Sequence, residues 1–122
     1  MMDQDTIGVV GLGTMGLGIA QVYASAGFAV IATDAHLPAR ETARTRMAEA
    51  LDARVSAGKL TEAARDATLA NLQIVESAQG FAPCTLVIEA IIERLDAKQS
   101  LFAALEAVLA PSAILATNTS SI

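Results

Sequence analysis

Apolar residues in this chain follow two alternating patterns. One consists of short runs of four to six apolar or β-branched residues, and the other spaces apolar residues among polar ones at helical intervals. Short continuous runs are typical of strands covered on both faces. They predict five strands, at residues 6–10, 29–33, 72–75, 85–90 and 113–117.

The segment between the first two predicted strands, "GLGTMGLGIAQVYASAGF", favours a helix. Its apolar residues recur at helical spacing, and a glycine follows at the position where helices commonly end. The expected apolar face comprises Ile19, Val22, Tyr23 and Ala26, with Gly27 as the C-terminal cap.

Two helices are expected between the second and third strands, where they would form a helical hairpin. The first runs from Pro38, which suits a first helical turn, to about Ala57, and Gly58 interrupts it. Thr61 is a good N-cap for the second, which extends to about Ala70. The apolar face of the first helix comprises Met47, Leu51 and Val55.

A last helix is expected over residues 96–109, ended by Pro111. Strands that alternate with helices indicate a parallel, doubly wound sheet, for which we expect the strand order 3-2-1-4-5. The inward positions of this helix are Leu101, Phe102, Leu105, Val108 and Leu109.

Composition limits the class of protein. The chain has 122 residues, of which 53% are apolar and 17% are charged. This length is typical of one domain, and the composition favours buried strands over disorder. No apolar run reaches the roughly 18 residues that a membrane span needs.

Charge and the N-terminus suggest where the protein works. A net charge of −5 gives no basic surface for nucleic acid, and the N-terminus lacks the basic region of a secretory signal. Cys84 is the single cysteine, which rules out an internal disulfide and fits a reducing compartment. We therefore expect a cytoplasmic protein without nucleic-acid or membrane partners.

Gly11, Gly13 and Gly16 form a G-x-G-x-x-G motif that follows a predicted strand and opens a predicted helix, and Asp34 ends the next strand. This is the dinucleotide-binding fingerprint of Rossmann-type folds. Gly11 would allow a tight turn, Gly13 would let a pyrophosphate approach the backbone, and Gly16 would let helix and strand pack closely, helped by Gly18. Amides at the helix start would attract the pyrophosphate.

The carboxylate of Asp34 is expected to accept hydrogen bonds from the adenosine ribose and to repel a 2′-phosphate. Two like charges about 4 Å apart repel by roughly 4 kcal/mol at an effective dielectric constant near 20. The nearest basic residue that follows in sequence is Arg40. The cofactor is therefore predicted to be NAD rather than NADP.

Neither the histidine His36 nor the cysteine Cys84 is expected to be a catalytic residue. His36 is the only histidine, but it follows Asp34 closely and so belongs at the adenosine end, away from the nicotinamide. Cys84 has no basic partner nearby in sequence, so we expect an inert thiol. No metal site is predicted.

Three segments together resemble the NAD-binding domain of the L-3-hydroxyacyl-CoA dehydrogenases. They are "GVVGLGTMGLGIAQVYASAGFAVIATD", "LVIEAIIERLDAKQSLFAALE" and "AILATNTSSI". The resemblance covers essentially the whole chain. These enzymes act in fatty-acid β-oxidation, butyrate metabolism and the breakdown of aromatic acids as CoA thioesters. The hairpin is similar to a family feature that leans toward the CoA substrate, although Arg54 and Lys59 are only candidates for its phosphates.

The resemblance also implies roles for individual residues. Ala90 would contact the cofactor through its backbone, Glu93 and Lys98 would reach the nicotinamide-side ribose, and Asn118 would lie against the nicotinamide. Ser120 would hydrogen-bond the substrate's 3-oxygen and the catalytic histidine. The alternatives are a salt-bridged helix start for Glu93 and Lys98 and a helix cap for "NTSS". The full cofactor set is Gly11, Leu12, Gly13, Thr14, Met15, Gly16, Asp34, Ala90, Glu93, Lys98 and Asn118, with Ser120 and Asn118 as catalytic residues.

The implied reaction oxidises L-3-hydroxyacyl-CoA to 3-ketoacyl-CoA with hydride transfer to NAD. The chain ends after "NTSSI", before the H-F-F-N-P segment that carries the family's catalytic histidine. Residues 1–122 are therefore expected to be a truncated NAD-binding Rossmann domain, inactive alone, of a homodimer that forms through a helical substrate domain.

Two other functions remain open. The chain could be a non-catalytic NAD-binding module, or part of a related 3-hydroxy acid or polyol dehydrogenase. The 3-hydroxyisobutyrate and 6-phosphogluconate enzymes also begin G-L-G-x-M-G. They usually lack the G-I-A continuation at residues 18–20 and the N-T-S-S element.

Overall fold

The computed structural model describes residues 5–91 and 95–117, with the side chains of residues 95–98 outside the description. Its centre is a sheet of five parallel strands in the order β3-β2-β1-β4-β5, which confirms the predicted fold class and strand order. The strands are β1 (Thr6–Val10), β2 (Ala29–Thr33), β3 (Leu72–Ile74), β4 (Leu86–Glu89) and β5 (Ile114–Thr117).

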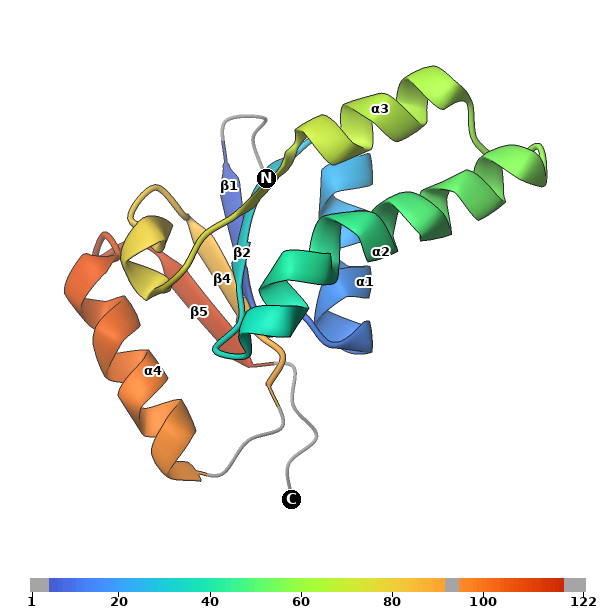
Figure 1. The fold of residues 1–122 in the computed structure, drawn as a ribbon. Coiled ribbons are helices and arrows are strands. Elements are labelled where there is room, and N and C mark those ends of the chain that lie inside the picture. Colours follow the sequence, from blue (N-terminus) through green and yellow to red (C-terminus); the bar gives the residue numbers. More distant parts are fainter. Residues whose placement is uncertain (1–4, 92–94, 118–122) are drawn as a thin grey trace.

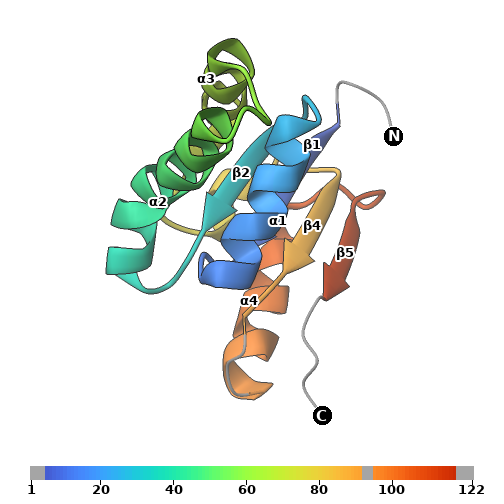
Figure 2. The same ribbon diagram turned by 90° about the vertical axis from the view of Figure 1, so that its right-hand side faces the viewer.

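The helices cover the sheet from both sides, as Figures 1 and 2 show. One layer holds α1 and the hairpin of α2 and α3, and the other holds α4 with a short 3-10 helix, η1. The helices are α1 (Thr14–Ser25), α2 (Leu37–Ser56), α3 (Glu62–Ala70), η1 (Ala78–Phe81) and α4 (Leu95–Val108). The two layers follow from right-handed crossovers that run outward from β1 in opposite directions.

The hairpin lies between β2 and β3, with its helix ends close to the expected positions. Thr61 caps α3, because its hydroxyl accepts a hydrogen bond of 3.1 Å from the amide of Ala64. Gly58 ends α2 with a φ of +75°, a backbone conformation that favours glycine. Met47 and Leu51 are fully buried, so α2 packs on the sheet through the predicted face.

The apolar face predicted for α1 is wrong in part. Val22 is 67% exposed and Ala26 is exposed, whereas Ile19 and Tyr23 are partly buried. The residues that face the sheet are Gly16, Leu17, Ala20 and Ala24. Close packing at Gly16 sets the rotation of the helix, and apolar spacing alone did not reveal that constraint.

The core has two halves, one on each face of the sheet. Ile7 and Val9 of β1 face the layer of α1 and α2, whereas Val10 belongs to the cluster with Phe81 and Leu105. No sequence pattern predicted η1, which has only four residues, yet it buries Phe81 completely. In the described part of the chain, no helix combines the length and apolar composition needed to cross a bilayer.

Candidate functional site

The glycine loop joins β1 to α1 at the carboxyl edge of the sheet. Gly11 has a φ of +110°, and its amide donates a hydrogen bond of 2.8 Å to the carbonyl of Thr33. Gly13 is exposed, and a Cβ there would meet nothing within 4 Å. At Gly16 a Cβ would lie 1.7 Å from the carbonyl oxygen of Gly11. The three glycines therefore have the turn, open-approach and packing geometry that the motif predicts.

The fourth glycine of the segment behaves differently. Gly18 is exposed, and a Cβ there would also meet nothing within 4 Å. The expectation that Gly18 helps the helix pack against the strand is therefore wrong. Its absent side chain leaves open surface instead.

The start of α1 is arranged for an anion. Gly13 is the N-cap, has extended backbone angles and contributes no side-chain cap, while its carbonyl accepts the first helical hydrogen bond, 2.9 Å from the amide of Leu17. The first amides of a helix have no intrahelical partner and carry the positive end of the helix dipole. Thr14 and Met15 lie exposed in this first turn. An anion such as a phosphate could bind here without any basic side chain.

Asp34 follows β2 and lies against the glycine loop. One carboxylate oxygen accepts a hydrogen bond of 2.6 Å from the amide of Leu12, and the other accepts one of 2.8 Å from the amide of His36. A carboxylate offers about four lone-pair positions, so these bonds leave room for further donors such as ribose hydroxyls. His36 is exposed beside Asp34, as the sequence predicts.

Two arginines of α2 reach this region, at positions that no sequence pattern predicted. A guanidinium nitrogen of Arg40 donates to the backbone carbonyl of Asp34 at 2.9 Å. Arg46 donates to the carbonyl of Leu12 at 2.8 Å and to that of Ala39 at 3.1 Å. The helix α2 begins at Leu37, shortly after Asp34, so its first turns pass close to the glycine loop. This short spacing was the sequence signal that could have placed the two arginines.

A pocket of about 470 Å³ adjoins Asp34 at the carboxyl ends of β1 and β2. Residues that follow β3 line it as well, among them Glu76 and Ala78, and so does Leu101 of α4. The pocket therefore begins at Asp34, the carboxylate predicted to hold the adenosine ribose, and continues to Leu101 of α4. Its position and size suit the adenine end of a dinucleotide.

At the end of β4, Glu89 is completely buried. One of its oxygens accepts a hydrogen bond of 2.6 Å from the amide of Ile91, and the other accepts one of 2.6 Å from the hydroxyl of Thr117. The sequence pattern indicated only that Glu89 belongs to a strand. A charged residue that ends an otherwise apolar buried strand was the overlooked signal.

Ala90 follows Glu89 and lies against the glycine loop. Its amide donates to the carbonyl of Val10 at 2.8 Å, and a Cβ on Gly11 would lie 3.0 Å from the carbonyl of Ala90. The exit of β4 and the exit of β1 therefore meet at the point where the strand order reverses. Ligands of open α/β sheets bind at this point.

Several predicted site residues lie outside the described residues, namely Glu93, Asn118 and Ser120. Lys98 lies in the first turn of α4, but its side chain is not described. Their roles remain predictions. Among the described residues, no group of three or more His, Cys, Asp or Glu side chains could hold a metal ion. Burial raises the pKa of Cys84 to about 11, so this cysteine is a protonated thiol at neutral pH.

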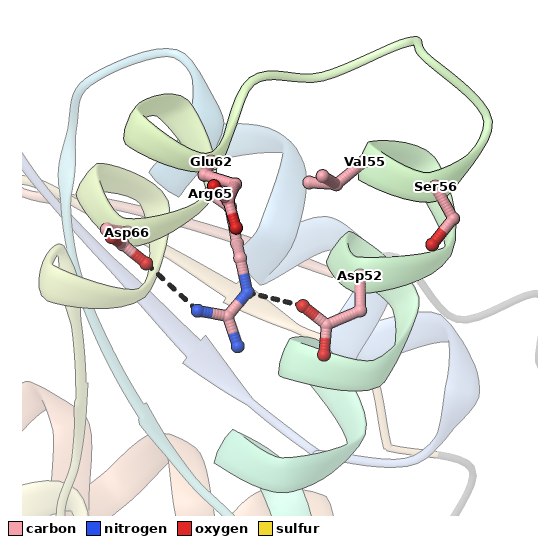
Figure 3. Close-up of a pocket in the computed structure, with 6 residues that line it drawn as sticks. All are labelled: Asp52, Val55, Ser56, Glu62, Arg65 and Asp66. Carbon is pink, nitrogen blue, oxygen red and sulfur yellow. Dashed lines mark hydrogen bonds and ion pairs between the residues drawn. The ribbon is translucent and has the colours of Figure 1, made fainter.

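A second hollow lies between α2 and α3, away from the glycine loop (Figure 3). Arg65 points into it between Asp52 and Asp66 and forms ion pairs with both. Glu62 is the third carboxylate in its lining. Three carboxylates against one guanidinium would repel a phosphate. Arg54 and Lys59, the candidates for CoA phosphates, are exposed and are not part of this lining.

Known proteins share this arrangement of sequence and fold. Residues 6–122 match the family model described as "3-hydroxyacyl-CoA dehydrogenase, NAD binding domain". The chain is 43% identical over its whole length to a 3-hydroxyadipyl-CoA dehydrogenase of Escherichia coli, and covers 26% of that protein. It is 42% identical to a 3-hydroxybutyryl-CoA dehydrogenase of Mycobacterium tuberculosis, with 95% of this chain and 41% of the relative covered.

A solved structure gives the same result. The crystal structure of a 3-hydroxybutyryl-CoA dehydrogenase from Escherichia coli superposes with a TM-score of 0.92 at 43% identity, over 99% of this chain and 26% of that one. The chain thus spans only a quarter to two fifths of the length of these relatives. Because the match includes the glycine loop, the helical hairpin and every strand, the chain belongs to the 3-hydroxyacyl-CoA dehydrogenase family, in which it corresponds to the NAD-binding domain.

Proposed function

We propose that this domain binds the cofactor of an enzyme that oxidises L-3-hydroxyacyl-CoA thioesters to 3-ketoacyl-CoA. The observation that carries the proposal is the joint position of the glycine loop, Asp34 and Ala90 at the switch point of the sheet. In this arrangement the amides at the start of α1 hold the pyrophosphate and Asp34 holds the adenosine ribose. Names of relatives support the substrate class, because they specify 3-hydroxyadipyl-CoA and 3-hydroxybutyryl-CoA.

The chemistry requires two transfers from the substrate. NAD, when bound, accepts the hydride that leaves C3, and a base takes the proton of the 3-hydroxyl group. The family resemblance assigns the base to a histidine in a segment that follows the N-T-S-S element. We propose that Ser120 donates a hydrogen bond to the 3-oxygen and that Asn118 lies against the nicotinamide. Glu93 and Lys98 would hold the nicotinamide-side ribose.

Two experiments test this proposal. Fluorescence titration of the 122-residue chain with NADH measures cofactor binding directly. Reduction of acetoacetyl-CoA by the full-length parent protein, followed by NADH absorbance, measures the reaction. We expect binding in the first and turnover in the second.

The alternatives give different results in the same assays. A full-length protein that binds NADH but reduces no 3-ketoacyl-CoA would be a non-catalytic module. Turnover of 3-hydroxyisobutyrate or a polyol instead would identify a related dehydrogenase. The extension of the G-L-G-x-M-G motif by Gly18, Ile19 and Ala20 favours the acyl-CoA enzymes.

The assembly and location of the parent protein belong to the same proposal. We propose a homodimer that forms through a helical domain and works in the cytoplasm, where a reduced, buried Cys84 would be stable. Light scattering of the full-length protein tests the dimer, and microscopy of a tagged copy tests the location. A monomer or a membrane-bound signal would contradict it.

A further inference from the structure

Leu12 lies between two glycines, yet it is fixed at three points. Its side chain is fully buried in the core, and its amide donates to the Asp34 carboxylate at 2.6 Å. Its carbonyl accepts a hydrogen bond of 2.8 Å from Arg46. The residue at the centre of the glycine loop is thus held from β2 on one side and from α2 on the other.

The hydrogen bond from Arg46 to the carbonyl of Leu12 determines the direction of the next amide, that of Gly13. A peptide group is planar and trans, so the N–H of Gly13 points opposite to the C=O of Leu12. Since Arg46 holds that carbonyl toward α2, the N–H of Gly13 points away from α2. Gly13 is exposed, with open space where a Cβ would be, so a ligand can reach this amide.

Glycine makes such a restraint necessary. Gly11 and Gly13 flank Leu12, and glycine populates positive and negative φ about equally well. The peptide group between Leu12 and Gly13 could therefore rotate at little energetic cost unless a side chain holds it. A rotated peptide would direct a carbonyl oxygen, rather than an amide, at a bound phosphate.

The guanidinium of Arg46 is itself held in place. Its Nε donates to the hydroxyl of Thr42 at 3.0 Å, and Nη2 also reaches the carbonyl of Ala39 at 3.1 Å. The neighbouring residue on α2, Met47, is fully buried in the core. Arg46 is therefore positioned before any ligand binds, and its rigid planar fork suits several acceptors at once.

We propose that Arg46 is a positioning residue of the cofactor site, which fixes the Leu12–Gly13 peptide so that the Gly13 amide faces the cofactor diphosphate. The inserted hairpin thus contributes to cofactor binding. This inference rests on the proposed role of the glycine loop, but not on the identity of the acyl-CoA substrate.

The test compares ligands with and without a diphosphate. Wild type, Arg46→Met and Arg46→Lys are titrated with NADH, ADP and adenosine, by fluorescence or by NMR. Arg54→Met is the matched control, because Arg54 is exposed and lies in the last turn of the same helix, beyond Arg46 and farther from its start. We expect Arg46→Met to weaken NADH and ADP binding by about 10- to 100-fold, the effect of one charge-assisted hydrogen bond.

Adenosine affinity should stay within about twofold of wild type, because adenosine carries no phosphate for Gly13 to bind. Arg46→Lys should remain impaired for NADH and ADP, since an ammonium group cannot reproduce the fork. If Arg46→Met does not fold, the same comparison is made with Arg46→Lys.

Four results would overturn the inference. They are unchanged NADH affinity, an equal loss for adenosine and ADP, full rescue by Arg46→Lys, or the same loss in Arg54→Met. Wild-type chain that binds neither NADH nor ADP would instead refute the proposed function. Wild type that binds NADH while the parent protein fails to turn over acetoacetyl-CoA leaves this inference intact.

Discussion

The carboxylate of Glu89 accepts a hydrogen bond of 2.6 Å from the hydroxyl of Thr117 on the neighbouring strand. The two residues are direct partners in the register of β4 and β5. The same carboxylate holds the amide of Ile91 in the turn that leaves β4. One buried side chain therefore joins the ends of two strands at the carboxyl edge, where the cofactor and the substrate oxygen are proposed to meet.

Replacing Glu89 should destabilise the domain. Glu89→Leu removes the acceptor of the Ile91 amide, and a buried or half-buried donor without a partner costs about 1–3 kcal/mol. Thr117 is exposed, so water can replace the lost contact at its hydroxyl. We expect the free energy of unfolding in urea to fall by about 1–3 kcal/mol for Glu89→Leu and by less for Thr117→Val. Equal stability of Glu89→Leu and wild type would contradict the role given to this carboxylate.

Gly16 and Gly18 form a matched pair for mutation, because both lie on α1. A Cβ on Gly16 would lie 1.7 Å from the carbonyl oxygen of Gly11, so Gly16→Ala must displace the loop. We expect Gly16→Ala to lose measurable NADH binding and to unfold at a lower temperature. Gly18→Ala meets nothing within 4 Å and should stabilise the helix by about 0.5–1 kcal/mol. Thermal unfolding followed by circular dichroism distinguishes the two.

Asp34 should control the choice between NAD and NADP. Removing its charge in Asp34→Asn reduces the repulsion of a 2′-phosphate, and the nearby guanidinium of Arg40 can then approach that phosphate. We expect the ratio of NADPH to NADH affinity to rise at least about tenfold, or about 1.4 kcal/mol. Adding Arg40→Ala to Asp34→Asn should reverse part of that gain. Titration of both variants with both cofactors provides the measurement, and an unchanged ratio would refute this role of Asp34.

Cys84 should lower the free energy of unfolding at alkaline pH. Burial raises its pKa from the ordinary 9.0 to about 11, so the thiol ionises more readily in the unfolded chain than in the folded one. The stabilisation that the neutral Cys84 thiol gives to the folded chain is fully present below pH 9 and is lost as the pH rises through 11. The loss amounts to at most about 3 kcal/mol, at 1.36 kcal/mol per pKa unit.

The measurement compares urea unfolding of wild type and Cys84→Ala between pH 8 and pH 11, a range that includes the ordinary and the raised pKa of the thiol. Both proteins carry the same lysines and tyrosine, so the difference between their two curves isolates the thiol. The free energy of unfolding of wild type should fall toward that of Cys84→Ala as the pH rises. A constant difference would show that the folded environment does not raise the pKa of Cys84.

Apart from η1, the elements and their order could be predicted from the sequence, because the signals are local. β-Branched runs favour strands, and Gly58 and Thr61 mark helix ends through their own backbone and side-chain chemistry. The G-x-G-x-x-G motif could also be read directly, since each glycine meets a steric need within one turn. The family resemblance depended on these same local segments, and the match over residues 6–122 confirms it.

The remaining features required the tertiary structure. The contact between Arg46 and Leu12 joins residues 34 positions apart, and that between Thr117 and Glu89 joins residues 28 apart. Their formation depends on how helices rotate and strands register once the core has packed, and close approach at Gly16 sets the rotation of α1. Sequence alone therefore determined the strands, the α-helices and the glycine loop. Packing decided which distant side chains hold that loop in place, because no local pattern encodes a contact between elements.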